Sequence, residues 1–258
     1  MKKRAMFLSF FIGLMVPSPV YSQSIAEHEG TLTITPSFVS DYMYRGVQLG
    51  GFSFQPTIEF TKGPLSLELF TNFPISDKIP GVSDPEIDFA ASYAWDVVPN
   101  LFTIKPGFWV YTYPRADEDS YKFTCEPYLS FDYTLNDITF LLNLYYDILM
   151  KGGGYEFGFN YSIPIKSLNN EMKLFALIGR YDMSDFYDVP YIKIRNKGDY
   201  FQVGVAIPYE FSKKSKLDIA WYIAKGTNNF IQRGAGIRES NPHAVGRGVL
   251  SLSYSYSF

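Results

Sequence analysis

Three features of the 258-residue chain predict an all-β fold. We expect a transmembrane antiparallel up-and-down β-barrel of about twelve strands, preceded by a cleaved signal peptide. First, many segments alternate apolar and polar side chains, which point to opposite faces of a strand. Second, aromatic residues make up 18% of the chain. Third, the last segment, Ser251 to Phe258, alternates serine with apolar side chains and ends on an aromatic residue.

The N-terminus predicts export from the cytoplasm. Met1 to Arg4 is basic, and the apolar run from Ala5 to Val16 is too short to span a bilayer. We therefore expect a signal peptide over residues 1–22, a short periplasmic N-terminal segment over 23–30 and the barrel over 31–258.

Composition excludes a helical membrane protein. The mean hydropathy is only −0.06, and after the signal segment no run approaches the roughly 18 apolar residues that a spanning helix needs. The net charge of −3 says little about partners. Cys125 is the only cysteine and cannot form an intramolecular disulfide, so we expect it to be a small apolar strand residue.

Several segments alternate cleanly with a period of two, and their acidic residues share the polar face. The clearest are Leu65–Leu69, Glu86–Trp95, Tyr121–Leu135, Tyr155–Tyr161 and Leu217–Ile223. In Leu101–Tyr113 and Met172–Tyr181 the lipid-facing side is ambiguous, because apolar residues occupy both faces.

The connections are expected to alternate between short and long, as in transmembrane barrels with periplasmic turns. Residues 61–64, 97–100 and 136–137 form short turns, whereas 182–198 and 226–246 are expected to be long loops. Both termini then lie on the short-turn side. A short connection at 151–154 breaks this rule, so ten or fourteen strands remain alternatives.

A secreted β-sandwich also alternates apolar and polar faces. It is disfavoured because the polar face carries small residues and carboxylates but few lysines. Tyrosine and tryptophan near strand ends fit the aromatic girdles of a membrane barrel better.

A dense motif follows the first predicted strand: Ser40, Asp41, Tyr42, Met43, Tyr44, Arg45 and Gly46. It resembles the TorF-type porin family, in which a Ser-Asp-Tyr-aromatic-Arg-Gly signature closes the first strand. The resemblance implies a small outer-membrane channel and does not indicate its substrate. Asp41 and Arg45 lie on the same side of a regular strand, so we expect them to pair at the lumen rim, with Gly46 permitting a sharp turn. The alternative is that Arg45 constricts the pore or contacts an anion.

The polar face predicts the composition of the lumen. Its charged residues are Glu59, Glu68, Glu86, Asp88, Lys105, Lys122, Glu126, Asp132, Asp147, Glu156 and Asp218. An excess of carboxylates in a confined channel raises the local cation concentration. We therefore expect passive diffusion of small solutes with a mild preference for cationic or neutral ones. The alternative is that these carboxylates pair with loop arginines folded inward (Arg195, Arg233, Arg238 and Arg247) or plug a narrow interior.

Two other function classes stay open, although we expect no enzyme activity, cofactor or metal. An outer-membrane enzyme acting on lipid or lipopolysaccharide would need a base, and the chain has only His28 and His243. A structural or adhesive barrel would use its long loops for partner binding. Acidic loop residues that could gather Ca²⁺ do not match an EF-hand; they are Asp117, Glu118, Asp119, Asp182, Asp185 and Asp188.

The terminal strand predicts the compartment and the assembly route. Tyr254, Tyr256 and Phe258 are expected to face lipid and to be recognised by the barrel assembly machinery of the bacterial outer membrane. The serines between them should close the barrel against Thr33, Thr35 and Ser37, giving a neutral, hydroxyl-lined seam. Expected partners are outer-membrane lipids, lipopolysaccharide and small solutes. Nucleic acid is not expected, because no basic stripe is present.

Overall fold

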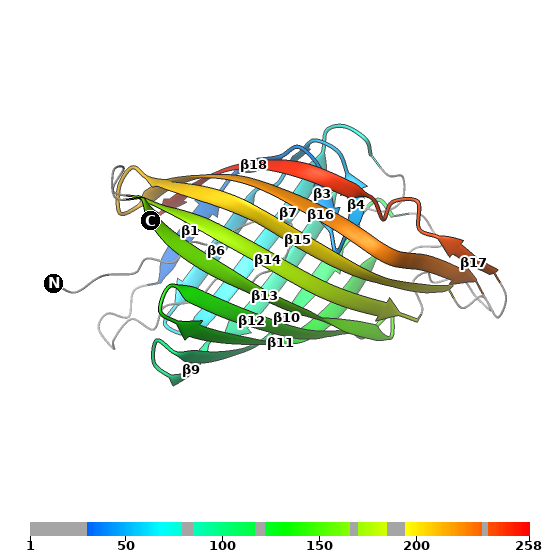
Figure 1. Ribbon diagram of the computed structural model, residues 1–258, viewed down its shortest axis with the longest axis horizontal. Coiled ribbons are helices and arrows are strands. Elements are labelled where there is room, and N and C mark those ends of the chain that lie inside the picture. Colours follow the sequence, from blue (N-terminus) through cyan, green and yellow to red (C-terminus); the bar gives the residue numbers. More distant parts are fainter. Residues whose placement is uncertain (1–29, 79–84, 117–121, 166–169, 185–193, 234–236) are drawn as a thin grey trace.

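The described chain forms a closed antiparallel barrel of twelve strands (Figure 1). The computed structural model describes residues 30–78, 85–116, 122–165, 170–184, 194–233 and 237–258, so the expected signal peptide lies outside the described residues. Successive barrel strands pair with each other, and β18 closes the sheet by pairing with β16 on one side and with β1 and β2 on the other. In the described residues no helix is long and apolar enough to cross a membrane.

Several barrel strands are built from two pieces. In chain order the strands are β1 (Thr31–Thr35), β2 (Ser37–Val39), β3 (Tyr42–Tyr44), β4 (Val47–Gly50), β5 (Ser53–Phe54), β6 (Thr57–Lys62), β7 (Leu65–Pro74), β8 (Glu86–Tyr93), β9 (Trp95–Val98), β10 (Phe102–Thr112), β11 (Phe123–Leu135), β12 (Ile138–Asp147), β13 (Gly152–Ile165), β14 (Asn170–Met183), β15 (Ile194–Glu210), β16 (Ser215–Arg233), β17 (Ile237–Ser240) and β18 (Gly246–Ser257). Pro36 separates β1 from β2, and Pro56 lies between β5 and β6, because proline has no N–H for the ladder. The pair β3 and β4 forms a separate two-stranded sheet.

The predicted alternation of faces is confirmed. On β8, Phe89 is 50% exposed whereas Asp88 is 1% exposed, and the same contrast separates Phe123 from Thr124 on β11. The structure also assigns the lipid-facing side of the two ambiguous segments, 101–113 and 172–181. Phe108 on β10 and Ile178 on β14 are exposed, and their sequence neighbours Trp109 and Leu177 are buried inside.

The seam has the expected hydroxyl character. Thr33 Oγ1 lies 2.9 Å from Ser257 Oγ, and Thr35 Oγ1 donates to Ser255 Oγ at 3.0 Å. The backbone N–H of the terminal Phe258 donates to the carbonyl of Leu32. The last residue of the chain therefore contributes to closing the sheet.

Two predicted loops are shorter than expected. β14 extends to Met183, β15 begins at Ile194, and β16 continues to Arg233, so parts of 182–198 and 226–246 are strand. The alternation of hydropathy ends in these segments because outward side chains that extend beyond the lipid are charged. Backbone pairing continues there nevertheless.

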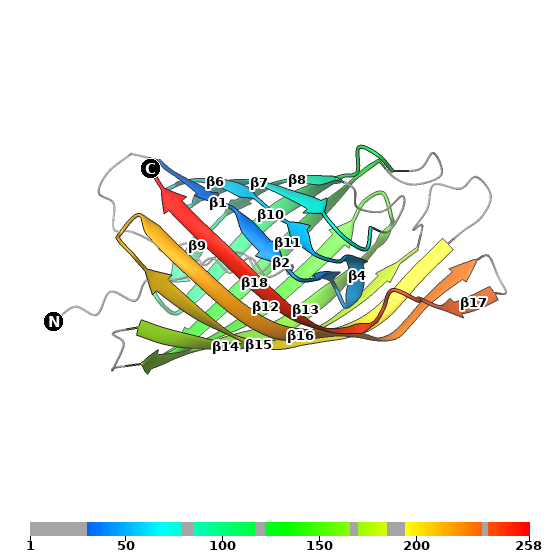
Figure 2. The ribbon, with the colours of Figure 1, turned by 90° about the horizontal axis from the view of Figure 1, so that it is seen from above.

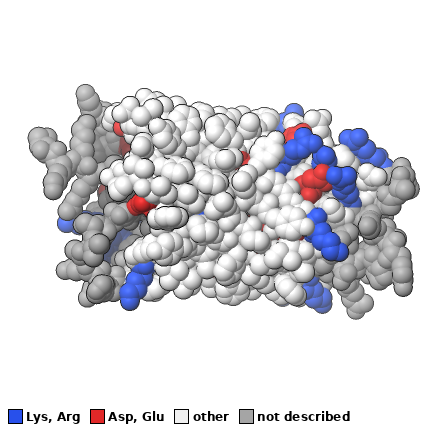
Figure 3. Space-filling view, turned by 90° about the horizontal axis from the view of Figure 1, so that it is seen from below, with Lys and Arg blue, Asp and Glu red and all other residues white. Residues whose placement is uncertain are grey.

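On the face drawn in Figure 3, a band with few charged residues separates two ends where charged residues gather. The chain terminus Phe258 lies at one end and β17 lies at the other (Figure 2). Exposed aromatic residues lie toward the terminus side of their strands, as in the aromatic girdle of a membrane barrel; they are Tyr93, Trp95, Tyr133, Tyr161 and Tyr209.

Val203 tests the assignment of the lipid face. It lies near the middle of β15 with its side chain 46% exposed. We expect Val203→Arg to lower the free energy of unfolding in lipid vesicles by about 2–4 kcal/mol, because it places a charge at the depth of the hydrocarbon. Val203→Leu, the apolar control, should unfold at nearly the wild-type urea concentration. Equal stability of the two variants would contradict the assignment.

Candidate functional site

The first long loop folds back into the barrel as the hairpin β3–β4. Tyr44 pairs with Val47 across a two-residue turn, in which Arg45 and Gly46 have φ values of 48° and 73°. Positive φ at both central residues is typical of a type I′ turn, whose twist matches that of its strands. The turn therefore closes a regular hairpin, and Arg45 stands at its tip.

The tip of the hairpin touches the barrel wall. A Cβ added to Gly46 would lie 2.6 Å from Gly226 Cα on β16 and 2.7 Å from Tyr200 Cβ on β15. Gly46 is thus required both for its φ and for its close approach to the wall.

Apolar packing holds the two strands of the hairpin. Met43 is 2% exposed and belongs to a cluster with Val39, Phe175, Tyr222, Ala224 and Val249. Val47 packs against a second cluster of Tyr145, Leu177, Tyr181, Met183 and Tyr200. The hairpin therefore docks chiefly against the inner faces of β12 and β14–β16.

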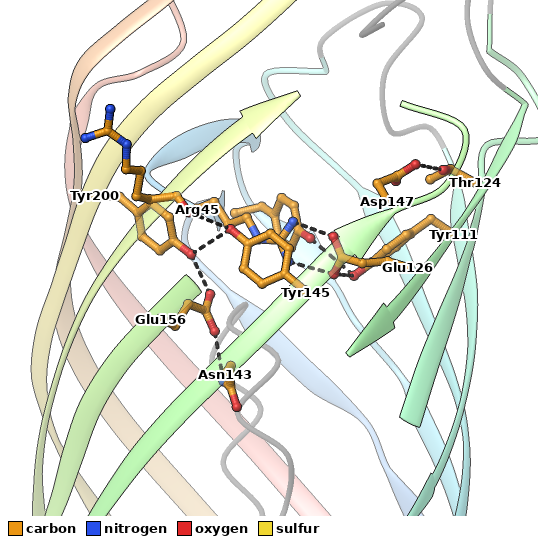
Figure 4. Close-up of polar contacts among 11 residues, drawn as sticks. Arg45, Tyr111, Thr124, Glu126, Asn143, Tyr145, Asp147, Glu156 and Tyr200 are labelled. Carbon is orange, nitrogen blue, oxygen red and sulfur yellow. Dashed lines mark hydrogen bonds and ion pairs between the residues drawn. The ribbon is translucent and has the colours of Figure 1, made fainter. Parts of the chain in front are cut away.

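Arg45 forms the central polar contact of the lumen (Figure 4). Its Nη1 and Nη2 donate to the two carboxylate oxygens of Glu126 on β11 at 2.8 and 2.7 Å. Its guanidinium carbon lies 3.5 Å from the ring centroid of Tyr145 and 4.7 Å from that of Tyr44. A charged hydrogen bond of this kind contributes about 1.5–3 kcal/mol, and the guanidinium face is covered by aromatic rings.

Tyrosines connect this ion pair to other carboxylates of the lumen. Tyr111 donates to Glu126 at 3.2 Å, and Tyr200 donates to Glu156 at 2.6 Å. Asn143 also donates to Glu156, at 3.0 Å. Asn143 and Tyr145 share the parity of the inward Asp147 along β12, so alternation along the sequence predicts that they too face the lumen.

The hairpin also contacts the wall formed by β8. Tyr42 donates its phenol O–H to Glu86 at 2.8 Å. Burial raises the pKa of the Tyr42 phenol well above its ordinary value, and the charges of Glu86 and Asp88 raise it further. Tyr42 therefore keeps its proton and remains a donor at neutral pH.

The expected rim pair between Asp41 and Arg45 is not formed. The chain leaves the barrel wall after β2, so residues 41–45 are not one regular strand, and the turn directs Arg45 toward Glu126. Asp41 instead accepts from Gln48 Nε2 at 3.0 Å and from Ser40 Oγ at 3.3 Å. The Ser40 N–H donates to Leu250 on β18, which anchors the start of the loop.

Most of the other residues expected to line the pore lie inside the barrel. Glu86, Asp88, Lys105, Glu126, Asp132, Asp147, Glu156 and Asp218 are buried on inward positions. Glu59 and Glu68 are half-buried and face each other across β6 and β7. Lys122 is exposed in the bend before β11.

Three of the lumenal carboxylates form ion pairs with bases: Glu126 with Arg45, Asp132 with Lys105, and Asp218 with Lys216. Of the remaining carboxylates, Glu59, Glu86, Asp88, Asp147 and Glu156 accept from neutral donors. The Ser66 hydroxyl donates to Glu59, the Thr112 N–H donates to Asp88, and the Met150 N–H donates to Asp147.

The loop arginines that we considered as partners of these carboxylates lie elsewhere. Arg195 pairs with Asp182, Arg238 lies over the ring of Phe230, and Arg247 donates to Gln48 at 3.0 Å. The side chain of Arg233 is outside the described part of the structure. The base that folds inward is Arg45.

The candidate catalytic and metal residues do not form a second site in the described part of the chain. His243 is exposed, and its carbonyl accepts from the Gln48 N–H. Residues His28, Asp117, Glu118, Asp119, Asp185 and Asp188 lie outside the described residues. Among those described, no group of three or more His, Cys, Asp and Glu could hold a metal ion.

The turn at Gly46 has a matched control within the chain. Gly46 and Gly63 both have positive φ, but a Cβ at Gly63 would meet nothing within 4 Å. We expect Gly63→Ala to cost about 1–2 kcal/mol from backbone strain alone. Gly46→Ala should cost more and should undock the hairpin, so that trypsin cleaves after Arg45. Equal protection of Arg45 in both variants would contradict the docked position.

The comparisons with known proteins agree with this architecture. No family model and no curated protein matches the sequence. Among solved structures, the KdgM porin has a TM-score of 0.52 at 12% identity and covers 88% of this chain and 99% of its own. An outer membrane channel from Pseudomonas putida F1 has a TM-score of 0.47 at 9% identity, covering 93% of this chain and 99% of its own. LpxR from Salmonella typhimurium has a TM-score of 0.47 at 10% identity, covering 88% and 99%. The chain therefore has the closed antiparallel β-barrel fold of outer-membrane proteins such as the KdgM porin.

Proposed function

We propose that this protein is a porin-like channel for passive diffusion of small solutes, constricted near its outer mouth by the hairpin β3–β4. One observation carries the proposal: the hairpin reaches two opposite walls. Tyr42 bonds Glu86 on β8, and Gly46 abuts Tyr200 on β15. These strands are six positions apart in the ring of twelve, so any solute must pass beside the hairpin.

Polar and acidic side chains on the inner face of the barrel support the proposed channel. Among the described residues, four buried carboxylate oxygens have no protein donor: Glu68 Oε1, Asp88 Oδ2, Asp132 Oδ1 and Asp218 Oδ1. A desolvated carboxylate oxygen is costly, so we expect water or permeating cations to solvate these atoms.

A mild preference for cationic or neutral solutes follows from the balance of charges in the lumen. Arg45, Lys105 and Lys216 each neutralise one carboxylate, which leaves the acidic wall of β6–β8 dominated by Glu59, Glu68, Glu86 and Asp88. In a confined lumen such a surplus attracts cations and repels anions.

We favour a channel over a barrel enzyme acting on lipid. The polar network centres on an ion pair and on tyrosines inside the barrel, and the exposed His243 contributes backbone contacts to the hairpin. A structural or adhesive barrel without an open pore would show no conductance in planar bilayers.

Conductance tests the role of the hairpin. We expect Arg45→Ala to raise single-channel conductance in planar bilayers by about twofold or more, because the tip loses its contact with Glu126 and the constriction widens. Arg195→Ala removes an exposed arginine outside the lumen and should leave conductance unchanged. Absence of conductance in the wild type and in Arg45→Ala would refute the channel.

Reversal potential across a KCl gradient tests the acidic wall. The double variant Glu59→Gln and Glu68→Gln should move the reversal potential toward zero, because it removes two lumenal charges without touching the hairpin. The control, Asp137→Asn with Glu239→Gln, removes two exposed charges from a turn and from β17. Anion selectivity of the wild type would contradict the proposed preference for cationic or neutral solutes.

A further inference from the structure

The exterior of β14–β16 changes from apolar to charged at one level. On β14 the outward residue after Ile178 is Arg180, and on β16 the outward residue after Ile223 is Lys225. Ile178 and Ile223 are exposed, as residues of the lipid-facing band are. Arg180 and Lys225 are exposed as well, so they follow directly on the apolar band.

The neighbours of these two bases on their own and adjacent strands are lipid-facing. Arg180 pairs across the sheet with Tyr155, an exposed residue at the loop-side end of β13. Lys225 pairs with Phe201, which pairs in turn with Ile178. On each strand the base directly follows an exposed apolar residue, Ile178 or Ile223, so both side chains begin at the edge of the apolar band, which is where lipid headgroups lie.

Further bases extend this surface away from the band. Arg195 and Lys197 project outward from β15, and we define the outer basic surface as Arg180, Arg195, Lys197 and Lys225. Its two acids are Asp182, which pairs with Arg195 and Lys197, and Asp199, which lies 3.3 Å from Arg180. Four bases against two acids leave a net charge of +2. In the described part of the chain no ion pair involves Lys225.

This charged surface is local. On four other strands of the described rim the outward residue near the loop-side end is apolar or aromatic: Phe73 on β7, Phe123 on β11, Tyr146 on β12 and Tyr155 on β13. On the face drawn in Figure 3, charged residues gather at this end of the molecule, beyond the band with few charges. A general need for solubility does not explain a basic surface restricted to neighbouring strands.

We propose that the outer basic surface binds the phosphorylated headgroup of a glycolipid in the outer leaflet of the outer membrane. Three observations support it: the bases lie on the lipid-facing side, they begin at headgroup depth, and they lie on the long-loop side, which faces outward. Arginine binds phosphate oxygens in a bidentate manner, while the acyl chains pack on Ile178, Val203 and Ile223 below. The surface lies outside the lumen, so the inference does not depend on the proposed channel.

Binding of lipid A to the refolded protein in neutral detergent tests the inference, with native mass spectrometry as the readout and EDTA present. We expect the double variant Arg180→Gln and Lys225→Gln to bind lipid A about tenfold more weakly. The control variant Lys213→Gln and Lys214→Gln removes two exposed lysines from the turn between β15 and β16 at the other end of the barrel. It should bind as the wild type does.

Four outcomes would overturn the inference. They are equal loss of binding in the control, equal binding of dephosphorylated lipid A, displacement by millimolar inorganic phosphate, and binding that requires added Mg²⁺. Heat-modifiable migration of each variant establishes that it has folded, and unchanged conductance separates this surface from the pore.

Discussion

The whole structure depends on closing one sheet without leaving a free edge. In a bilayer no water reaches the strand backbones, so every N–H and C=O within the hydrocarbon must find a partner in the sheet. β18 meets this constraint by pairing with β16 on one side and with β1 and β2 on the other. Pro36 and Pro56 each lie between two paired segments of a barrel strand, and their carbonyls still accept from the N–H groups of Tyr254 and Thr71.

Closure determines which polar groups the interior must accommodate. Once one face of every strand is lipid-facing, all remaining polar side chains share a confined lumen, and carboxylates outnumber bases there. Arg45 reaches a wall carboxylate from a loop, 81 residues away in sequence from Glu126. Removing one partner of such a buried pair leaves the other charge without compensation, which is the costly case for a buried charge. The first loop is thus part of the interior of the barrel.

Local periodicity was sufficient to predict the wall but not the hairpin. The period of two assigned Asp88 and Phe89 to opposite faces correctly, because burial on one side of a closed sheet admits no exceptions in the middle of a strand. The motif around Arg45 has the same local alternation, yet its direction depends on Glu126, Tyr145 and Gly226, which are distant in sequence. The local sequence predicts only the turn, because Gly46 suits a sharp reversal of the chain.

The unequal strand lengths relate the inner site to the outer surface. β15 and β16, with 17 and 19 residues, are longer than β7 with 10. The added length extends the inner face of the barrel, and the tip of the hairpin contacts this extension at Tyr200 and Gly226. Because strand side chains alternate, the same extension must also project residues outward beyond the lipid band, where charge carries no desolvation penalty. Three consecutive residues of β14 illustrate this: Tyr181 faces inward and belongs to the cluster that Val47 contacts, whereas Arg180 and Asp182 on either side face outward. A shorter β14–β16 wall would lose the support for the hairpin and the outer basic surface together.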